Sequence, residues 1–69
     1  MDDWVLRVAE TLEKARAEAG ISQAILAKRM GVSRQSVIKW EQGINAISFP
    51  MMMQWFVGCG VSLERYLDS

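Results

Sequence analysis

Apolar residues recur along the chain at the three- and four-residue spacing of amphipathic helices. No segment alternates apolar and polar residues as a half-buried strand does. Because serine favours the start of a helix and glycine favours its end, these two residue types divide the pattern into five stretches. The first stretch runs to Gly20, and the later four begin at Ser22, Ser33, Ser48 and Ser62. The sequence therefore predicts an all-α fold of five short helices.

Each predicted helix has apolar positions that we expect to face a common core. They are Trp4, Val5, Val8, Leu12 and Ala15 in the first helix, Leu26, Ala27 and Met30 in the second, and Val37 and Trp40 in the third. The fourth helix ends near Gly58 or Gly60, and the short fifth contains Leu63, Tyr66 and Leu67. Neither a linker nor a repeat interrupts the chain, so residues 1–69 are predicted to form a single domain.

The 69-residue composition excludes several classes of protein. There is no apolar run of the roughly 20 residues that a membrane-spanning helix needs, and no secretory signal, so we expect a cytoplasmic protein that has no contact with membranes. Cys59 is the single cysteine and histidine is absent, which excludes an intrachain disulfide and the usual zinc sites. We expect no metal and no cofactor, and a fold that rests on packing alone.

The formal net charge is zero, but the charges are not evenly distributed. Both ends of the chain are acidic, whereas between residues 19 and 45 the charged residues are Lys28, Arg29, Arg34, Lys39 and Glu41. A positive middle segment suits contact with the phosphates of DNA. The alternative, that these charges are ordinary solvated side chains on several helices, stays open at this point.

Residues 22–42 have the pattern of two short helices that cross at about 90 to 120° over a short turn. Ala27 provides a small side chain where the helices touch, and Gly31 can adopt the positive φ that the turn requires. Val37 and Trp40 then fill the angle between the two helices. This segment is predicted to be a helix-turn-helix.

The segment resembles the Cro/CI-type helix-turn-helix of phage-repressor-like regulators, also called the xenobiotic-response-element family. The matching stretches are G-I-S-Q, L-A-K-R-M-G-V-S, W-E-Q-G and G-V-S-L, and together they cover nearly the whole chain. The resemblance implies a five-helix, lambda-repressor-like DNA-binding domain that places its third helix in the major groove. The loop G-I-N-A after the third helix is less basic than in many relatives, which implies weaker attraction to phosphate.

On this resemblance, Arg34, Gln35, Ser36 and Lys39 occupy the base-reading positions of the third helix. The chemistry agrees, because arginine can pair with guanine and glutamine with adenine through two hydrogen bonds each. Both residues lie in the first turn, the part of a recognition helix nearest the base edges. The alternative is that they are ordinary polar surface residues.

The candidate phosphate contacts are Ser22, Gln23, Ser33 and Asn45, since helix N-termini and short polar side chains suit anions. Helix capping alone would also explain the two serines. The resemblance further implies an ion pair between Arg16 in the first helix and Glu41 in the third, which would hold the recognition helix in register. As a surface pair it would contribute only about 0 to 1 kcal/mol, and two separately solvated charges are the alternative.

The fourth helix contains more apolar side chains than one inward face can bury. We expect a homodimer formed by the fourth and fifth helices, with an interface at Met51, Met52, Trp55 and Tyr66, because a contiguous apolar patch often marks a protein contact. The alternative is that a small domain exposes a few scattered apolar residues.

These patterns indicate a stand-alone transcriptional regulator, a repressor that binds an inverted-repeat operator in double-stranded DNA and that a regulatory protein can control. An enzyme is disfavoured, because the titratable residues are scattered and Cys59 has no histidine partner. The alternative is a protein-interaction module or an antitoxin-like partner that keeps the fold with weak or no DNA binding. The zero net charge and the apolar Ile25, Ile38 and Ile44 favour that alternative.

Overall fold

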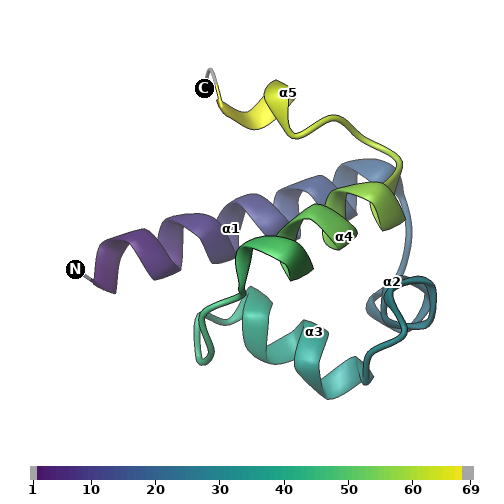
Figure 1. The fold of residues 1–69 in the computed structure, drawn as a ribbon, viewed down its shortest axis with the longest axis horizontal. Helices are drawn as coiled ribbons and strands as arrows, with labels where there is room; N and C mark the ends of the chain where they lie inside the picture. Colours follow the sequence, from purple (N-terminus) through teal and green to yellow (C-terminus); the bar gives the residue numbers. More distant parts are fainter. Residues whose placement is uncertain (1, 68–69) are drawn as a thin grey trace.

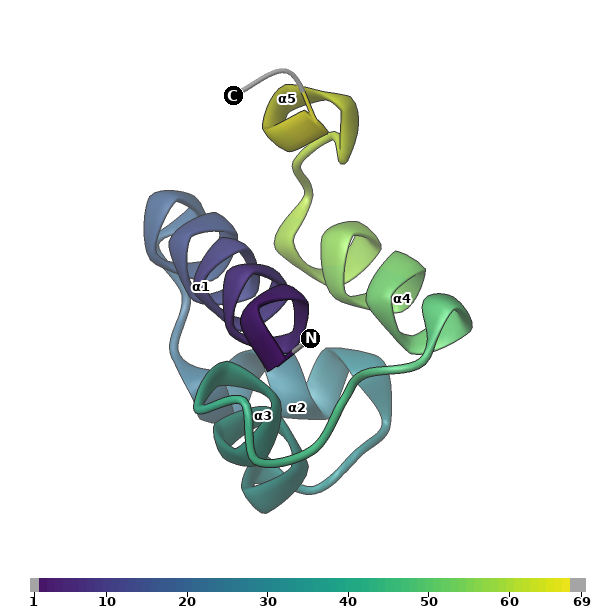
Figure 2. The same ribbon diagram turned by 90° about the vertical axis from the view of Figure 1, so that its left-hand side faces the viewer.

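The computed structural model describes residues 2–67 and contains, in that range, five α-helices and no strand (Figure 1). The helices are α1 (Asp2–Ala19), α2 (Gln23–Met30), α3 (Arg34–Glu41), α4 (Phe49–Cys59) and α5 (Glu64–Leu67). Helices α1 and α4 lie beside each other, and α2 and α3 pack together below them. Both views place α3 and α5 at opposite ends of the molecule (Figures 1 and 2). The predicted all-helical fold is confirmed.

Serine caps and glycine stops set the bounds of the central helices. Ser22, Ser33 and Ser48 have extended backbones, and each hydroxyl accepts a hydrogen bond from the backbone N–H three residues later. These bonds of 3.1 to 3.3 Å satisfy donors that have no partner within the helix. Gly31 and Gly60 end α2 and α4 with φ near +72°, a conformation that glycine adopts without a steric penalty. The fourth helix thus ends at Gly60, the later of the two predicted stops.

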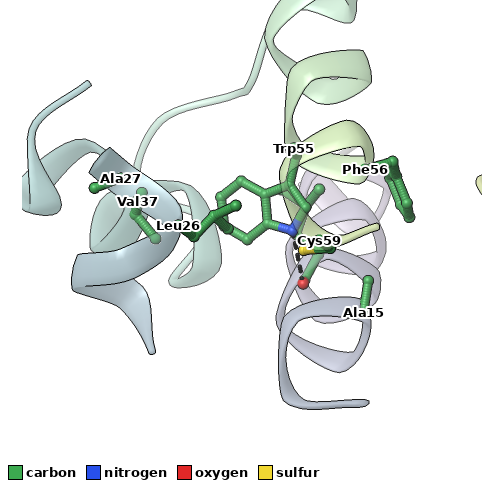
Figure 3. Packing of buried hydrophobic residues seen from close by; sticks show 8 residues of the cluster. Ala15, Leu26, Ala27, Val37, Trp55, Phe56 and Cys59 are labelled. Atoms are coloured by element: carbon green, nitrogen blue, oxygen red, sulfur yellow. Dashed lines mark hydrogen bonds between the residues drawn. The ribbon is translucent and has the colours of Figure 1, made fainter. Parts of the chain in front are cut away.

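Trp55 of α4 lies at the centre of the core and is fully buried. Its indole Nε1 donates a 3.0 Å hydrogen bond to the backbone carbonyl of Leu12 in α1, and its ring reaches toward Leu26 of α2 (Figure 3). The ring of Trp40 in α3 meets it edge-on, with 6.3 Å between the ring centroids. One side chain therefore contacts all three of the other long helices.

Gly58 lets α2 and α4 approach closely. A Cβ atom at this position would lie 2.7 Å from Cδ1 of the buried Leu26, closer than carbon atoms can pack. The two helices can approach this closely because position 58 has no side chain. Any larger residue there would displace Leu26.

Two residues expected in the core are exposed. The side chain of Trp4 is 69% exposed, because the first turn of α1 extends beyond the helices packed against it (Figure 1). The guanidinium of Arg7 lies over its ring, 5.4 Å from the centroid. Leu67 in the last turn of α5 is also exposed. The core is thus shorter at both ends than the apolar pattern suggests.

Tyr66 attaches α5 to the rest of the domain. Its ring packs on Phe56 of α4, with 5.6 Å between the centroids, and its hydroxyl donates a 2.6 Å hydrogen bond to the carboxylate of Glu18 in α1. This hydrogen bond, which the ionised phenol could not donate, raises the pKa of Tyr66 above its ordinary value.

Arg16 and Glu41 form the ion pair that joins α1 to α3. Arg16 donates through Nε to Oε2 of Glu41 at 2.5 Å and through Nη2 to Oε1 at 3.2 Å, and Nη1 reaches the carbonyl of Ile21 at 2.9 Å. The Gln23 amide donates to Oε1 of Glu41 at 2.9 Å. This contact with Glu41 raises the pKa of Arg16. One carboxylate therefore connects α1, α2 and α3.

The pair differs from the surface pair that the sequence suggested. The side chains of Arg16 and Glu41 are only 16% and 4% exposed, so water screens their interaction weakly. Removing one partner would leave a largely buried charge without its counterion, which costs more than the loss of a surface pair.

The central position of Trp55 predicts a large effect of a small substitution. Trp55→Phe should lower the free energy of unfolding by about 2 kcal/mol, because it leaves a cavity and removes the donor to Leu12. Trp40→Phe is the matched control and should cost less, since Trp40 is only partly buried. Chemical denaturation of both variants measures the difference, and equal losses would contradict the central role of Trp55.

The buried ion pair predicts strong coupling between its two members. Arg16→Met and Glu41→Leu should each lower the free energy of unfolding by about 3 kcal/mol, because each leaves one buried charge unpaired. The double variant should lose clearly less than the sum of the two single variants. A double-mutant cycle by urea denaturation measures this coupling, and additive losses below about 1 kcal/mol would show two independent surface charges.

Candidate nucleic-acid interface

The outer face of α3 presents three polar side chains to solvent. Arg34, Gln35 and Lys39 are exposed, whereas Val37 on the inner face is fully buried. A turn of about 100° per residue places Gln35 and Lys39 on the same line of the helix, opposite Val37. Within the described part of the chain, none of the three exposed side chains makes a hydrogen bond or ion pair with a neighbour. They are therefore available to a partner outside the domain.

Ser36 lies deeper than the other predicted base-reading residues. Its side chain is half-buried, and its hydroxyl lies 3.1 Å from the hydroxyl of the exposed Ser33. Ser33 also accepts the backbone N–H of Ser36 and so caps α3. The two serines form one small polar group at the start of the helix.

The predicted phosphate-contacting residues are spread over three segments around α3. Ser22 is exposed at the start of α2, Ser33 at the start of α3, and Asn45 in the loop that follows α3. The structure thus brings two helix N-termini and one loop to the surroundings of the same helix. Backbone N–H groups at helix N-termini suit the oxygen atoms of phosphate.

Gln23 has a structural contact that the sequence did not indicate. Its side-chain Nε2 donates to Glu41 at 2.9 Å, and the residue is half-buried. A second amide hydrogen and the backbone N–H remain for an outside acceptor. Gln23 and Glu41 are 18 residues apart in the sequence. Their contact becomes visible only in the structure, where the start of α2 lies beside the end of α3.

The surface around α2 and α3 is positive. Lys28, Arg34 and Lys39 are exposed, and Arg29 donates a 2.8 Å hydrogen bond to the carbonyl of Gly58 in α4. Glu41 is the acidic residue of these two helices, and Arg16 neutralises it. Because Glu41 is paired with Arg16, it does not offset the exposed cations of α2 and α3. This surface therefore has a positive charge, although the whole chain has zero net charge.

The predicted dimer interface needs a correction. Trp55 is fully buried among the helices of its own chain, so the prediction that it contacts a second copy is wrong. Met51, Met52 and Tyr66 are half-buried and keep part of their surface in solvent. The large apolar side chains that α4 exposes are instead Phe49, Met53 and Val57.

The described residues offer little material for catalysis. Cys59 is buried, and this burial raises the pKa of its thiol, which disfavours the reactive thiolate. Among the described residues, no group of histidine, cysteine and acidic side chains is arranged to hold a metal ion. No helix in the same range is both long and apolar enough to cross a membrane.

Comparison with known proteins assigns the chain to a family. The helix-turn-helix family model of the Cro/CI type matches residues 12–66, which include all of α2, α3 and α4. No curated protein and no solved structure is significantly similar to the chain. The family match confirms the resemblance drawn from the sequence motifs. The protein therefore belongs to the Cro/CI-type helix-turn-helix family of DNA-binding transcription regulators.

Proposed function

We propose that this protein is a repressor that binds an inverted-repeat operator as a homodimer, with α3 of each copy in the major groove. The observation that carries the proposal is the exposed face of α3, where Arg34, Gln35 and Lys39 have no partner within the described residues. Repression needs only occupation of a site that a polymerase must use, which a small DNA-binding domain can supply. Such a protein acts where the genome lies, in the cytoplasm of a bacterial or phage-infected cell.

In this proposal the first turn of α3 reads the bases. The guanidinium of Arg34 pairs with O6 and N7 of a guanine, and the amide of Gln35 pairs with N6 and N7 of an adenine. Lys39 follows one turn later on the same exposed face and reaches a base edge or a phosphate. Ser36 lies at the edge of this face, where its hydroxyl can add a hydrogen bond to DNA.

The residues around α3 fix its position on the duplex. Ser22, Gln23 and Ser33 stand at helix N-termini, where backbone N–H groups and the helix dipole favour a phosphate. Asn45, which is exposed in the loop after α3, contacts a phosphate near the other end of the helix. Because Gln23 is also bonded to Glu41, a phosphate held there is connected to the recognition helix through a single side chain.

A second function, the protein-interaction module, has one observation in its favour. Ile25 on α2 and Ile44 in the loop after α3 are exposed, and neither is a side chain that phosphate attracts. Apolar groups on a recognition surface can also meet thymine methyl groups, so these residues are compatible with DNA as well. The salt dependence of binding separates the two functions, since contact with phosphates weakens as salt rises.

The test begins with selection of bound sites from random duplexes, followed by titration of variants on the selected operator. Arg34→Ala and Gln35→Ala should each weaken operator binding by about 1 to 3 kcal/mol and relax the preference at one base pair in each half-site. Lys39→Ala should do the same if Lys39 reaches a base. If Lys39 meets only phosphate, the loss is uniform across sequences, and the slope of log K against log salt becomes shallower by about 0.9 per contact.

Arg34→Lys is the matched control for charge. It keeps the positive charge and the salt dependence but loses the planar fork that pairs with guanine, so it should lose sequence preference while retaining general affinity. Lys28→Ala removes an exposed cation of α2 outside the proposed base-reading face and should leave the preference unchanged. Unaltered operator preference in the three α3 variants would contradict the proposal and favour the interaction module.

A further inference from the structure

A groove of about 640 Å³ opens between α1, α4 and α5, the three helices in the upper part of Figure 2. Its walls are mostly apolar and include Val8, Met52 and Phe56. Trp4 and Leu67, the two residues that the apolar pattern placed in the core and the structure leaves exposed, both line this groove. These two side chains are covered only when another molecule fills it.

The size and lining of the groove fit a small molecule. Small-molecule sites are concave, hold about 300 to 1000 Å³ and have mostly apolar walls with a few polar groups. Stable contacts between proteins need about 800 Å² on each partner. The groove has the first set of properties, and α5, which forms one of its walls, is only four residues long.

Two contacts of Tyr66 keep the α5 wall in place. Its ring packs on Phe56 of α4, and its hydroxyl donates a hydrogen bond to Glu18 of α1. Leu63, directly before α5, also packs against the core. The groove is thus largely preformed, as sites for small ligands usually are.

The charged residues that line the groove are Arg7, Glu10 and Lys14, all on α1. Arg7 and Lys14 lie two helical turns apart, about 10 Å along the axis, and Glu10 is a neighbour of both on the helix surface. Within the described part of the chain, their side chains form no ion pair or hydrogen bond. Glu64 and Arg65 of α5 do not line the groove and have opposite charges. The α1 rim therefore has one positive charge in excess, which favours an anion.

We propose that this groove binds a small organic acid with one carboxylate and an apolar body. The apolar body packs between Val8, Phe56 and Leu67, and the carboxylate lies at the α1 rim within reach of Arg7 and Lys14. Both cationic side chains have long flexible stems, so they can converge on one carboxylate. Burial of the apolar body supplies most of the affinity, and the carboxylate fixes its orientation.

This site goes beyond the proposed function and does not depend on it. None of the proposed base-reading residues of α3 lines the groove. Helices α3 and α5 lie at opposite ends of the molecule (Figures 1 and 2). The acid and DNA can therefore be bound at the same time.

Titration of the full chain with dodecanoate below its micelle concentration tests the site by heteronuclear NMR. The indole N–H signal of Trp4 and the backbone amide signal of Leu67 should shift and saturate together. The indole N–H of Trp55, which is bonded to the Leu12 carbonyl in the core, should move much less. Dodecyltrimethylammonium has the same chain length but a positive head, so it should bind at least about 10-fold more weakly.

Charge variants of α1 separate a specific site from general adsorption of detergent. Arg7→Gln and Lys14→Gln should each raise the dissociation constant for dodecanoate about 3-fold, and Glu10→Gln should lower it by about the same factor. Lys28→Gln is the matched control, since it removes an exposed cation of α2 outside the groove. All four positions are exposed, so circular dichroism should show unchanged helix content.

An apolar variant tests the α5 wall. Leu67→Gln replaces an exposed apolar side chain of the groove with a polar one and should raise the dissociation constant about 5-fold. Leu6→Gln is the matched control, because Leu6 is an exposed leucine of α1 that does not line the groove. It should leave the affinity for dodecanoate unchanged.

Saturable binding with opposite effects of Lys14→Gln and Glu10→Gln supports the organic-acid site. Absence of saturable binding overturns it, and so does equal binding of the two probes. A shift of the Trp55 signal as large as that of Trp4 indicates unfolding by the detergent and also overturns it. If Leu67→Gln converts a dimer into a monomer in sedimentation analysis, a second copy occupies the groove and the proposal is wrong.

The site and the proposed function fail separately. Arg34→Ala should bind dodecanoate as the unmodified protein does, so a failure of DNA recognition by α3 leaves the groove site standing. A groove that binds no acid likewise leaves base reading by α3 standing.

Discussion

The contact of Trp55 with three helices at once holds the arrangement of the domain together. Its ring lies against Leu26 of α2 and Trp40 of α3, and its N–H reaches the Leu12 carbonyl of α1. A phenylalanine could fill part of this space but could not donate, and a smaller apolar residue would leave a cavity. The orientation of α3 relative to α4 depends on this contact, because Trp40 of α3 packs directly on the indole of Trp55.

The pair of Arg16 and Glu41 acts at the same end of α3 as Trp40. Trp40 fixes the helix through apolar packing, and the neighbouring Glu41 fixes it through charge and hydrogen bonds to α1 and α2. Two adjacent residues thus hold the last turn of α3 from two directions, and the buried Val37 anchors the middle of the helix in the core. In the proposed function, a helix held in this way presents its exposed face without needing to reorganise on DNA, which reduces the entropic cost of binding.

Much of this fold was predictable from the sequence, because local chemistry sets the helix bounds. The serine caps and the glycine stops act within a few residues, and once they fix the phase of α3, its inward and outward positions follow. Helix α4 was not predictable in the same way. It is apolar on nearly every side, so periodicity cannot tell which face is buried, and the predicted dimer interface includes Trp55, which is buried in the core. Only packing against α1, α2 and α3 decides that orientation. The Gln23 contact was missed for the same reason, since it depends on the meeting of distant segments.

The segregation of charge along the chain explains how a neutral protein can serve as a DNA-binding regulator. Zero net charge limits long-range attraction to a polyanion, so binding must rely on the few exposed cations of α2 and α3. In the proposed function each copy offers few phosphate contacts, so a single copy is expected to bind DNA weakly at physiological salt. In the proposed dimer the second copy binds at high effective concentration once the first has bound, which multiplies affinity without adding charge. In the proposed function, the second copy thus supplies affinity that the few exposed cations of one copy do not provide.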